Sequence, residues 1–124
     1  MKILAIDHIQ LAMPAGEETR ARAFYGGLLG LSESPKPPEL AKRGGVWFQT
    51  ENVTLHLGIE TDFRPAQKAH PALLVDNLEA FLQACQANGV ETDASQPPLE
   101  GYKRAHVFDP FGNRIELMEK LLGS

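Results

Sequence analysis

Three histidines and one glutamate have the types and the positions needed to hold a metal ion. They stand at polar positions of otherwise apolar segments, and they are His8, His56, His70 and Glu116. Because residues alternate between the two faces of a β-strand, each side chain is expected on the face opposite the core. Imidazole nitrogens and a carboxylate oxygen that converge from separate strands can bind one divalent cation. We therefore predict a metal site made of these four residues.

The hydrophobic pattern predicts the strands and helices that must position these side chains, and the pattern occurs twice. The first copy comprises strands over 6–13, 45–50 and 52–59 and a helix over 17–29. The second comprises strands over 70–75, 103–108 and 114–119 and a helix that begins at the capping box Asp76-x-x-Glu79. Each copy reads as a βαβββ unit in which the short strand after the helix has no clear signal.

The repeat gives the four polar residues related positions. His8 opens the first unit and His56 closes it, while His70 opens the second and Glu116 closes it. Equivalent positions of two equivalent units are related by a local pseudo-two-fold. We expect an α+β fold in a single domain over 1–124, and its parts are a first module at about 3–59, a linker at 60–69 and a second module at about 70–120.

Composition excludes several classes of function. The net charge is −4 and the acidic and basic residues are interspersed, so no basic stripe predicts nucleic-acid binding. No apolar run has the length of a membrane span, and no signal-peptide pattern is present, which predicts a cytoplasmic protein without a membrane partner. The single cysteine, Cys85, excludes an intrachain disulfide and lies on the apolar stripe of the second helix, where we expect it buried.

Four motifs connect the chain to a known family. They are Asp7-His8-Ile9, Phe24-Tyr25-x-x-Leu28-Leu29-Gly30-Leu31, His70-Pro71-Ala72-Leu73-Leu74-Val75-Asp76 and Asp109-Pro110-Phe111-Gly112-Asn113-Arg114-Ile115-Glu116-Leu117. Through them nearly the whole chain resembles the vicinal oxygen chelate superfamily of glyoxalase I, extradiol dioxygenases, and fosfomycin and bleomycin resistance proteins. The resemblance implies two βαβββ modules that form a curled mixed sheet with a U-shaped cleft around a divalent metal, usually in a homodimer.

The resemblance also implies roles for the predicted ligands. The family's metal positions fall on His8, His70 and Glu116, the two-histidine, one-carboxylate set that suits Fe(II) or Mn(II), although Zn and Ni are not distinguished. Glyoxalase I has a glutamate where this chain has His56. That histidine also resembles a histidine of extradiol dioxygenases that lies beside the metal without binding it. His56 is thus a fourth ligand, an acid/base residue or a polar residue of the cleft, and the module symmetry favours the ligand.

Five further residues are candidates for catalysis or substrate binding. His106 falls where dioxygenases and fosfomycin enzymes carry an active-site tyrosine, so we expect it to contact substrate as a second catalytic candidate beside the metal. Trp47 can stack on a substrate or pack in the core. Arg64 and Lys68 can form an anion site or belong to a solvated linker. Arg104 shares the predicted non-core face with His106.

The function predicted from the sequence is a small metal-dependent enzyme that chelates two oxygens of a small-molecule substrate. Its chemistry is that of a glyoxalase-like lyase or isomerase, or of a dioxygenase. The alternative is a non-catalytic protein of the bleomycin-resistance type, and the retained ligand set favours the enzyme. The glyoxalase resemblance further implies sites shared across a homodimer, with His8 and His56 from one chain and His70 and Glu116 from the other. Sites within one chain are the competing arrangement.

Overall fold

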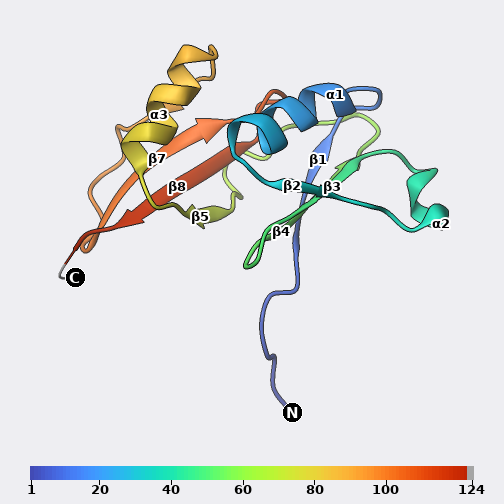
Figure 1. The fold of residues 1–124 in the computed structure, drawn as a ribbon, viewed down its shortest axis with the longest axis horizontal. Helices are drawn as coiled ribbons and strands as arrows, with labels where there is room; N and C mark the ends of the chain where they lie inside the picture. Colours follow the sequence, from blue (N-terminus) through green and yellow to red (C-terminus); the bar gives the residue numbers. More distant parts are fainter. Residues whose placement is uncertain (123–124) are drawn as a thin grey trace. The chain divides into compact units, whose positions relative to one another are not determined.

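The computed structural model describes residues 1–122 of the chain (Figure 1). They form two compact units, Met1–Arg64 and a second unit that begins at Pro65. The boundary between the units falls within the stretch predicted as a linker. No helix among the described residues has both the length and the apolar character needed to cross a membrane.

The first unit has the order of elements expected for a βαβββ module. Its elements are β1 (Ile9–Met13), α1 (Glu18–Ala21), the π-helix η1 (Arg22–Leu28), β2 (Ser32–Ser34), α2 (Pro38–Ala41), β3 (Val46–Gln49) and β4 (Thr54–Ile59). The strands form a four-stranded sheet in the order β1-β4-β3-β2. Strand β1 is parallel to β4, whereas β3 is antiparallel to both of its neighbours.

The second unit repeats this arrangement. Its elements are β5 (Ala72–Leu74), α3 (Leu78–Ala87), β6 (Thr92–Asp93), β7 (Tyr102–Phe108) and β8 (Arg114–Lys120). The sheet order is β5-β8-β7-β6, with β5 parallel to β8 and antiparallel pairing elsewhere. Figure 1 shows β7 and β8 as the long paired strands of this unit, with α3 beside them. The predicted α+β class and the two βαβββ modules are confirmed.

Each unit buries its own apolar residues between its sheet and its helices. The largest buried side chains of the first unit are Met13, Tyr25, Val46, Phe48, Leu55 and Leu57, and those of the second are Cys85, Val107, Ile115 and Leu117. The predicted burial of Cys85 is confirmed. Removing each large apolar side chain from water contributes about 1.5–3 kcal/mol, so these residues provide the main stabilising term of each unit.

Several predicted boundaries were wrong, and two of them affect the site. His8 and His70 lie just before β1 and β5 rather than within these strands. The helix predicted over 17–29 is α-helical for one turn and then widens into η1, where the N–H of Leu29 donates to the carbonyl of Phe24 at 2.9 Å. Glycines at 26 and 27 are poor α-helix formers, which weakens the α-helical alternative there.

The capping box predicted at Asp76 and Glu79 was also wrong. Helix α3 is capped by Asn77, whose Oδ1 accepts a hydrogen bond from the N–H of Ala80 at 3.0 Å. Glu119 of β8 accepts a second bond, from the N–H of Leu78 at 2.8 Å. Asn77 and Glu119 therefore accept hydrogen bonds from N–H groups that would otherwise be unpaired at the start of α3. A local sequence motif cannot predict the bond to Glu119, which comes from the sheet.

The turn between β7 and β8 is a buried polar cluster. Asp109 Oδ1 accepts hydrogen bonds from the backbone N–H groups of Phe111 and Asn113, at 2.9 and 2.8 Å. The Asn113 side chain donates to Asp109 Oδ2 at 2.9 Å and accepts from the N–H of Ala66, also at 2.9 Å. The cluster thus fixes the segment at Ala66, which leads into Lys68 and His70.

Candidate metal centre

Glu116 lies on β8, which is an inner strand of the second sheet and pairs with β5 on one side and β7 on the other. In the β7–β8 pair it stands opposite His106, and in the β5–β8 pair it stands opposite Ala72. His70 precedes β5 by two residues, so its imidazole reaches Glu116 from the parallel side of the strand. Sheet pairing therefore brings together three side chains that are far apart in the sequence.

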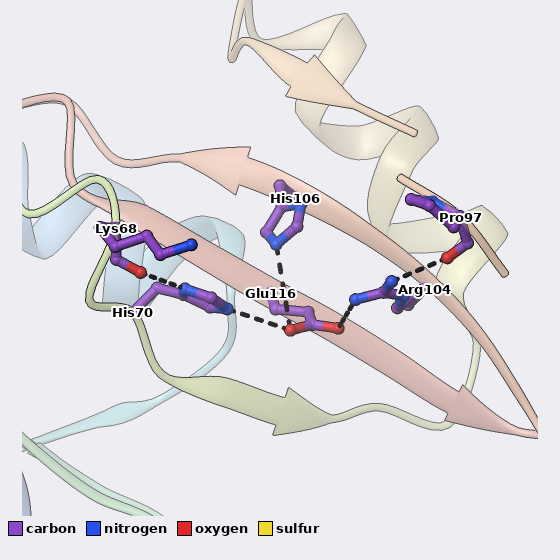
Figure 2. Close-up of polar contacts among 6 residues, drawn as sticks. All are labelled: Lys68, His70, Pro97, Arg104, His106 and Glu116. Atoms are coloured by element: carbon purple, nitrogen blue, oxygen red, sulfur yellow. Dashed lines mark hydrogen bonds and ion pairs between the residues drawn. The ribbon is translucent and has the colours of Figure 1, made fainter. Parts of the chain in front are cut away.

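Three side chains converge on the Glu116 carboxylate (Figure 2). Oxygen Oε1 lies 3.1 Å from His70 Nε2 and 3.9 Å from His106 Nε2. Oxygen Oε2 accepts a hydrogen bond from Arg104 Nη1 at 3.1 Å, and Arg104 Nη2 donates to the carbonyl of Pro97 at 2.7 Å. One carboxylate oxygen is thus held by a guanidinium while the other faces two imidazoles.

The charges of this cluster follow from burial and from its hydrogen bonds. Burial acts to raise the pKa of Glu116, but the hydrogen bonds from Arg104 and His70 outweigh it, so that the pKa is lowered. Burial lowers the pKa of His106, and the positive charge of Arg114 acts in the same direction. The centre therefore combines an ionised carboxylate with a neutral, buried imidazole.

The two ring nitrogens of His70 both face groups that only accept hydrogen bonds. Nδ1 lies 2.9 Å from the carbonyl oxygen of Lys68, and Nε2 lies 3.1 Å from Glu116 Oε1. A neutral imidazole has a single N–H, so it can satisfy only one of these acceptors. A cation between Nε2 and Oε1 satisfies the other, and metal-bound histidines commonly donate their second N–H to a backbone carbonyl in this way. The donor set therefore fits a divalent metal.

In the first unit His8 and His56 belong to a stack of three rings. Trp47 lies parallel to His56, with centroids 3.9 Å apart and planes at 3°, and His8 stacks against His56 at 4.4 Å. His8 Nδ1 also contacts Asp7 Oδ1 at 2.8 Å. Burial lowers the pKa of His56, and the nearby His8 lowers it further. The stack fixes the ring plane of a neutral imidazole and leaves its in-plane nitrogens available to a proton or a metal.

The two sheets place their functional residues in equivalent register. Gln10 stands opposite His56 as Ala72 stands opposite Glu116. The equivalent pairs are His8 with His70, Trp47 with His106 and His56 with Glu116. The second unit therefore has a potential ligand at all three places, whereas the first has an indole at one of them.

A pocket of about 480 Å³ lies beside the ring stack in the first unit. His8, Trp47 and His56 line it together with two cations, Lys36 and Arg43. The Lys36 ammonium lies 6.0 Å from the centroid of the Trp47 ring. Sequence reasoning missed both cations because they lie in the irregular connection around α2. The proline residues on either side of Lys36 were the only local signal there.

The other predicted substrate-binding residues lie in different surroundings. Trp47 lines the pocket as proposed. Arg104 is held by Glu116 and Pro97 rather than pointing freely toward a substrate. Lys68 borders a separate hollow of about 350 Å³ in the second unit, and Arg64 is exposed at the end of the first. Their roles in substrate binding stay predictions.

The predicted metal ligands are divided between the units. His8 and His56 lie together in the first, and His70 and Glu116 lie together in the second. Among the described residues, one group of three has ligand atoms that all lie within 4.8 Å of one another, and it consists of His70, His106 and Glu116. A shared site of the four predicted ligands stays a prediction.

With this geometry established, the chain can be assigned to a family. The model of the Glyoxalase/Bleomycin resistance protein/Dioxygenase superfamily matches residues 5–117, so the chain belongs to this superfamily. A solved structure from Bacillus anthracis, assigned to the glyoxalase family, is 47% identical, with a TM-score of 0.87 and 98% of each chain covered. No curated protein gives a match.

More distant structures share the fold. The fosfomycin resistance protein FosX from Listeria monocytogenes is 17% identical, with a TM-score of 0.76 and coverage of 98% of this chain and 97% of that chain. A FosX variant was solved with Mn(II) and dihydroxypropylphosphonic acid, and it matches at 17% identity with a TM-score of 0.79, covering 98% of this chain and 95% of that chain. The family predicted from the sequence motifs is confirmed.

Proposed function

We propose that the chain is a metal-dependent enzyme that binds two oxygen atoms of a small molecule at a divalent ion. The observation that carries this proposal is the pair of His70 Nε2 and Glu116 Oε1, which lie 3.1 Å apart while the other ring nitrogen faces the Lys68 carbonyl. A cation bound between these two atoms would take both as ligands and leave the ring N–H to donate to the Lys68 carbonyl.

The chain's own residues prepare the centre for such an ion. A divalent ion supplies Lewis-acid stabilisation of negative charge that develops on substrate oxygens. Arg104 holds Glu116 Oε2, so the carboxylate presents only Oε1 to the site. The Pro97 carbonyl holds the guanidinium in turn. Glu116 is therefore oriented before any ligand arrives, as an efficient site requires.

We further propose that His56 carries a proton during the reaction. Burial lowers its pKa, so the imidazole is neutral and can accept a proton near neutral pH. Trp47 stacks against its face and fixes the direction of the ring nitrogens. A neutral base of this kind suits both an isomerase, which moves a substrate proton, and a dioxygenase, which removes a hydroxyl proton.

The substrate class that the first unit favours is a small anion. Lys36 and Arg43 both line the pocket beside Trp47, and a guanidinium and an ammonium together suit a carboxylate or a phosphonate. The FosX structure with dihydroxypropylphosphonic acid gives a precedent on this fold for a molecule with two adjacent oxygens and a phosphonate. At 17% identity it supports the idea only as a shared scaffold.

A homodimer is part of the proposal. The segment before β1 is exposed and apolar, with Ile3 at 95%, Leu4 at 84% and Ile6 at 81% relative exposure. A second copy would cover these side chains, because exposed apolar segments of this kind favour association. We propose that His8 and His56 of one chain then complete the site of its partner.

A non-catalytic binding protein of the bleomycin-resistance type is the second candidate. The observation that favours it is the ring stack of His8, His56 and Trp47, which offers a flat surface to an aromatic ligand. Such a protein would bind its ligand equally well with and without metal. The enzyme would require the metal and Glu116.

The deciding experiment combines metal loading with a substrate panel. The protein is stripped with a chelator and reloaded with Mn(II), Fe(II), Zn(II) or Ni(II). It is then assayed with a thiohemiacetal, a catechol under oxygen, and fosfomycin. Metal-dependent turnover that Glu116→Gln abolishes and the exposed control Glu51→Gln retains would support the enzyme. Absence of metal binding, together with metal-independent ligand binding, would overturn it.

A further inference from the structure

His106 is a buried imidazole without a hydrogen-bond partner. The residue is 2% exposed, and among the described residues neither Nδ1 nor Nε2 has a donor or acceptor within hydrogen-bonding distance. Burying a polar nitrogen without a partner is unfavourable, because its hydrogen bonds to water are lost on folding and not replaced. Buried polar groups are satisfied in most folds, so one that is not satisfied indicates a missing partner.

The position of His106 indicates what that partner is. Its Nε2 lies 3.9 Å from Glu116 Oε1, and its ring meets the ring of His70 edge-on, with centroids 5.2 Å apart and planes at 83°. Bonds of about 2.0–2.2 Å from nitrogen and oxygen ligands to one metal ion separate the ligand atoms by roughly 3–3.5 Å. The three ligand atoms all lie within 4.8 Å of one another, so an ion that binds all three would draw them closer together.

We propose that His106 is a protein ligand of this metal ion, beside His70 and Glu116. This rests on the proposed metal centre but not on the reaction catalysed there. It assigns His106 a role different from the substrate contact predicted from the sequence. Two imidazoles and one carboxylate leave coordination positions open, as a catalytic Zn(II), Fe(II) or Mn(II) site requires.

The sheet holds His106 where a ligand is needed. The residue is paired on both sides, with Asp93 of β6 and Glu116 of β8, so its backbone is fixed in the middle of the sheet. The equivalent residue of the first unit is Trp47, whose indole nitrogen is a hydrogen-bond donor only and cannot bind a metal ion. At this position of the repeat, the second unit therefore has a residue that can bind metal, whereas the first unit does not.

Metal titration of substituted chains tests the assignment without any assay of activity. The full-length protein is stripped of metal and titrated with Zn(II) by calorimetry and with Co(II) by visible absorption. Loss of residues that only orient a ligand commonly weakens metal binding about 10–100-fold, so His106→Gln should weaken it by at least that much. It should also change the Co(II) spectrum. Glu51→Gln, at an exposed carboxylate outside the centre, serves as the control and should retain the wild-type affinity.

A second variant keeps the test decisive if His106→Gln folds poorly. His106→Cys retains a side chain that can bind metal, so Co(II) should bind and give a thiolate-to-cobalt charge-transfer band. Wild-type affinity in His106→Gln, or Co(II) binding to His106→Cys without that band, would overturn the assignment while leaving the proposed metal centre intact. If Zn(II) and Co(II) do not bind to the wild-type chain, both proposals are wrong.

Discussion

Trp47 lies parallel to His56 at 3.9 Å, in the place that His106 holds beside Glu116 in the second sheet. The same register thus carries an aromatic stack in one unit and a potential ligand set in the other. A stacked ring is restrained in its plane, so the nitrogens of His56 keep a fixed direction. This arrangement suits transfer of a proton more than binding of a metal ion.

The first prediction concerns the role of His56. We expect His56→Ala to leave metal affinity nearly unchanged and to lower turnover by about 10²–10⁴, the usual contribution of a general acid or base. Calorimetric titration and steady-state rates measure the two effects separately. A marked loss of metal affinity would instead restore the ligand role that the module symmetry favoured in the sequence.

The second prediction concerns the sharing of sites between chains. In a homodimer whose sites combine His56 of one chain with Glu116 of the other, mixing inactive His56→Ala and Glu116→Ala chains should restore activity. Random exchange of subunits in a two-fold dimer should recover about a quarter of the wild-type rate. Self-mixing of either variant is the control. Light scattering that shows a monomer, or no recovery after verified exchange, would contradict the shared site.

Part of the site could be predicted from the sequence because strand periodicity shows which side chains leave the core. This reasoning identified His8, His56, His70 and Glu116 and their matched positions. It did not indicate His106 as a ligand, because the observation that suggests this is a buried ring without a hydrogen-bond partner. The burial of the His106 ring is determined by tertiary packing, and the hydrophobic pattern of the sequence does not show it. Lys36 and Arg43 were missed for a similar reason, since irregular connections have no periodicity to interpret.

The fold was predictable to the level of element order but less so at the ends of elements. Asp76 and Asn77 are both good helix-capping residues, and only the structure shows that Asn77 accepts the bond from Ala80. The predicted first helix failed at its glycine pair, where the backbone adopts a π-helix. Local preference is weak at such positions, and tertiary packing decides between alternatives.

The third prediction tests that cap. Asn77→Ala should lower the free energy of unfolding by about 1 kcal/mol, because the first turn of α3 loses its side-chain acceptor. Asp76→Ala, one residue earlier, should have a smaller effect. Urea unfolding followed by circular dichroism measures both. A larger loss in Asp76→Ala would show that the predicted capping box operates in solution.

The fourth prediction concerns Cys85, whose pKa is raised by burial in the core. The native thiol should react slowly with an aromatic disulfide reagent at pH 8 and fully only after unfolding. A raised pKa in the folded state means that the thiol's contribution to stability is present below pH 9 and is lost as the pH rises further. Cys85→Ala should therefore reduce the alkaline loss of stability. Fast reaction of the native protein would contradict the burial.

The last prediction concerns the buried turn that supports the candidate metal centre. Asn113→Asp keeps the shape of the side chain but replaces the amide donor facing Asp109 Oδ2 with a second carboxyl group. The lost bond and the added buried charge should destabilise the fold by more than about 1–3 kcal/mol at neutral pH. Loosening the bond to Ala66 should also weaken Zn(II) binding, because His70 follows that segment.

The exposed Asn52→Asp adds the same charge without burial and serves as the control for this change. Burial beside Asp109 should raise the pKa of the new carboxyl group. The free energy of unfolding that Asn113→Asp loses should therefore become smaller as the pH falls and the group is protonated. Denaturant unfolding at pH 5 and pH 7, with Zn(II) titration at pH 7, measures these effects. Equal stability and equal affinity in Asn113→Asp and Asn52→Asp would show that the turn does not position His70.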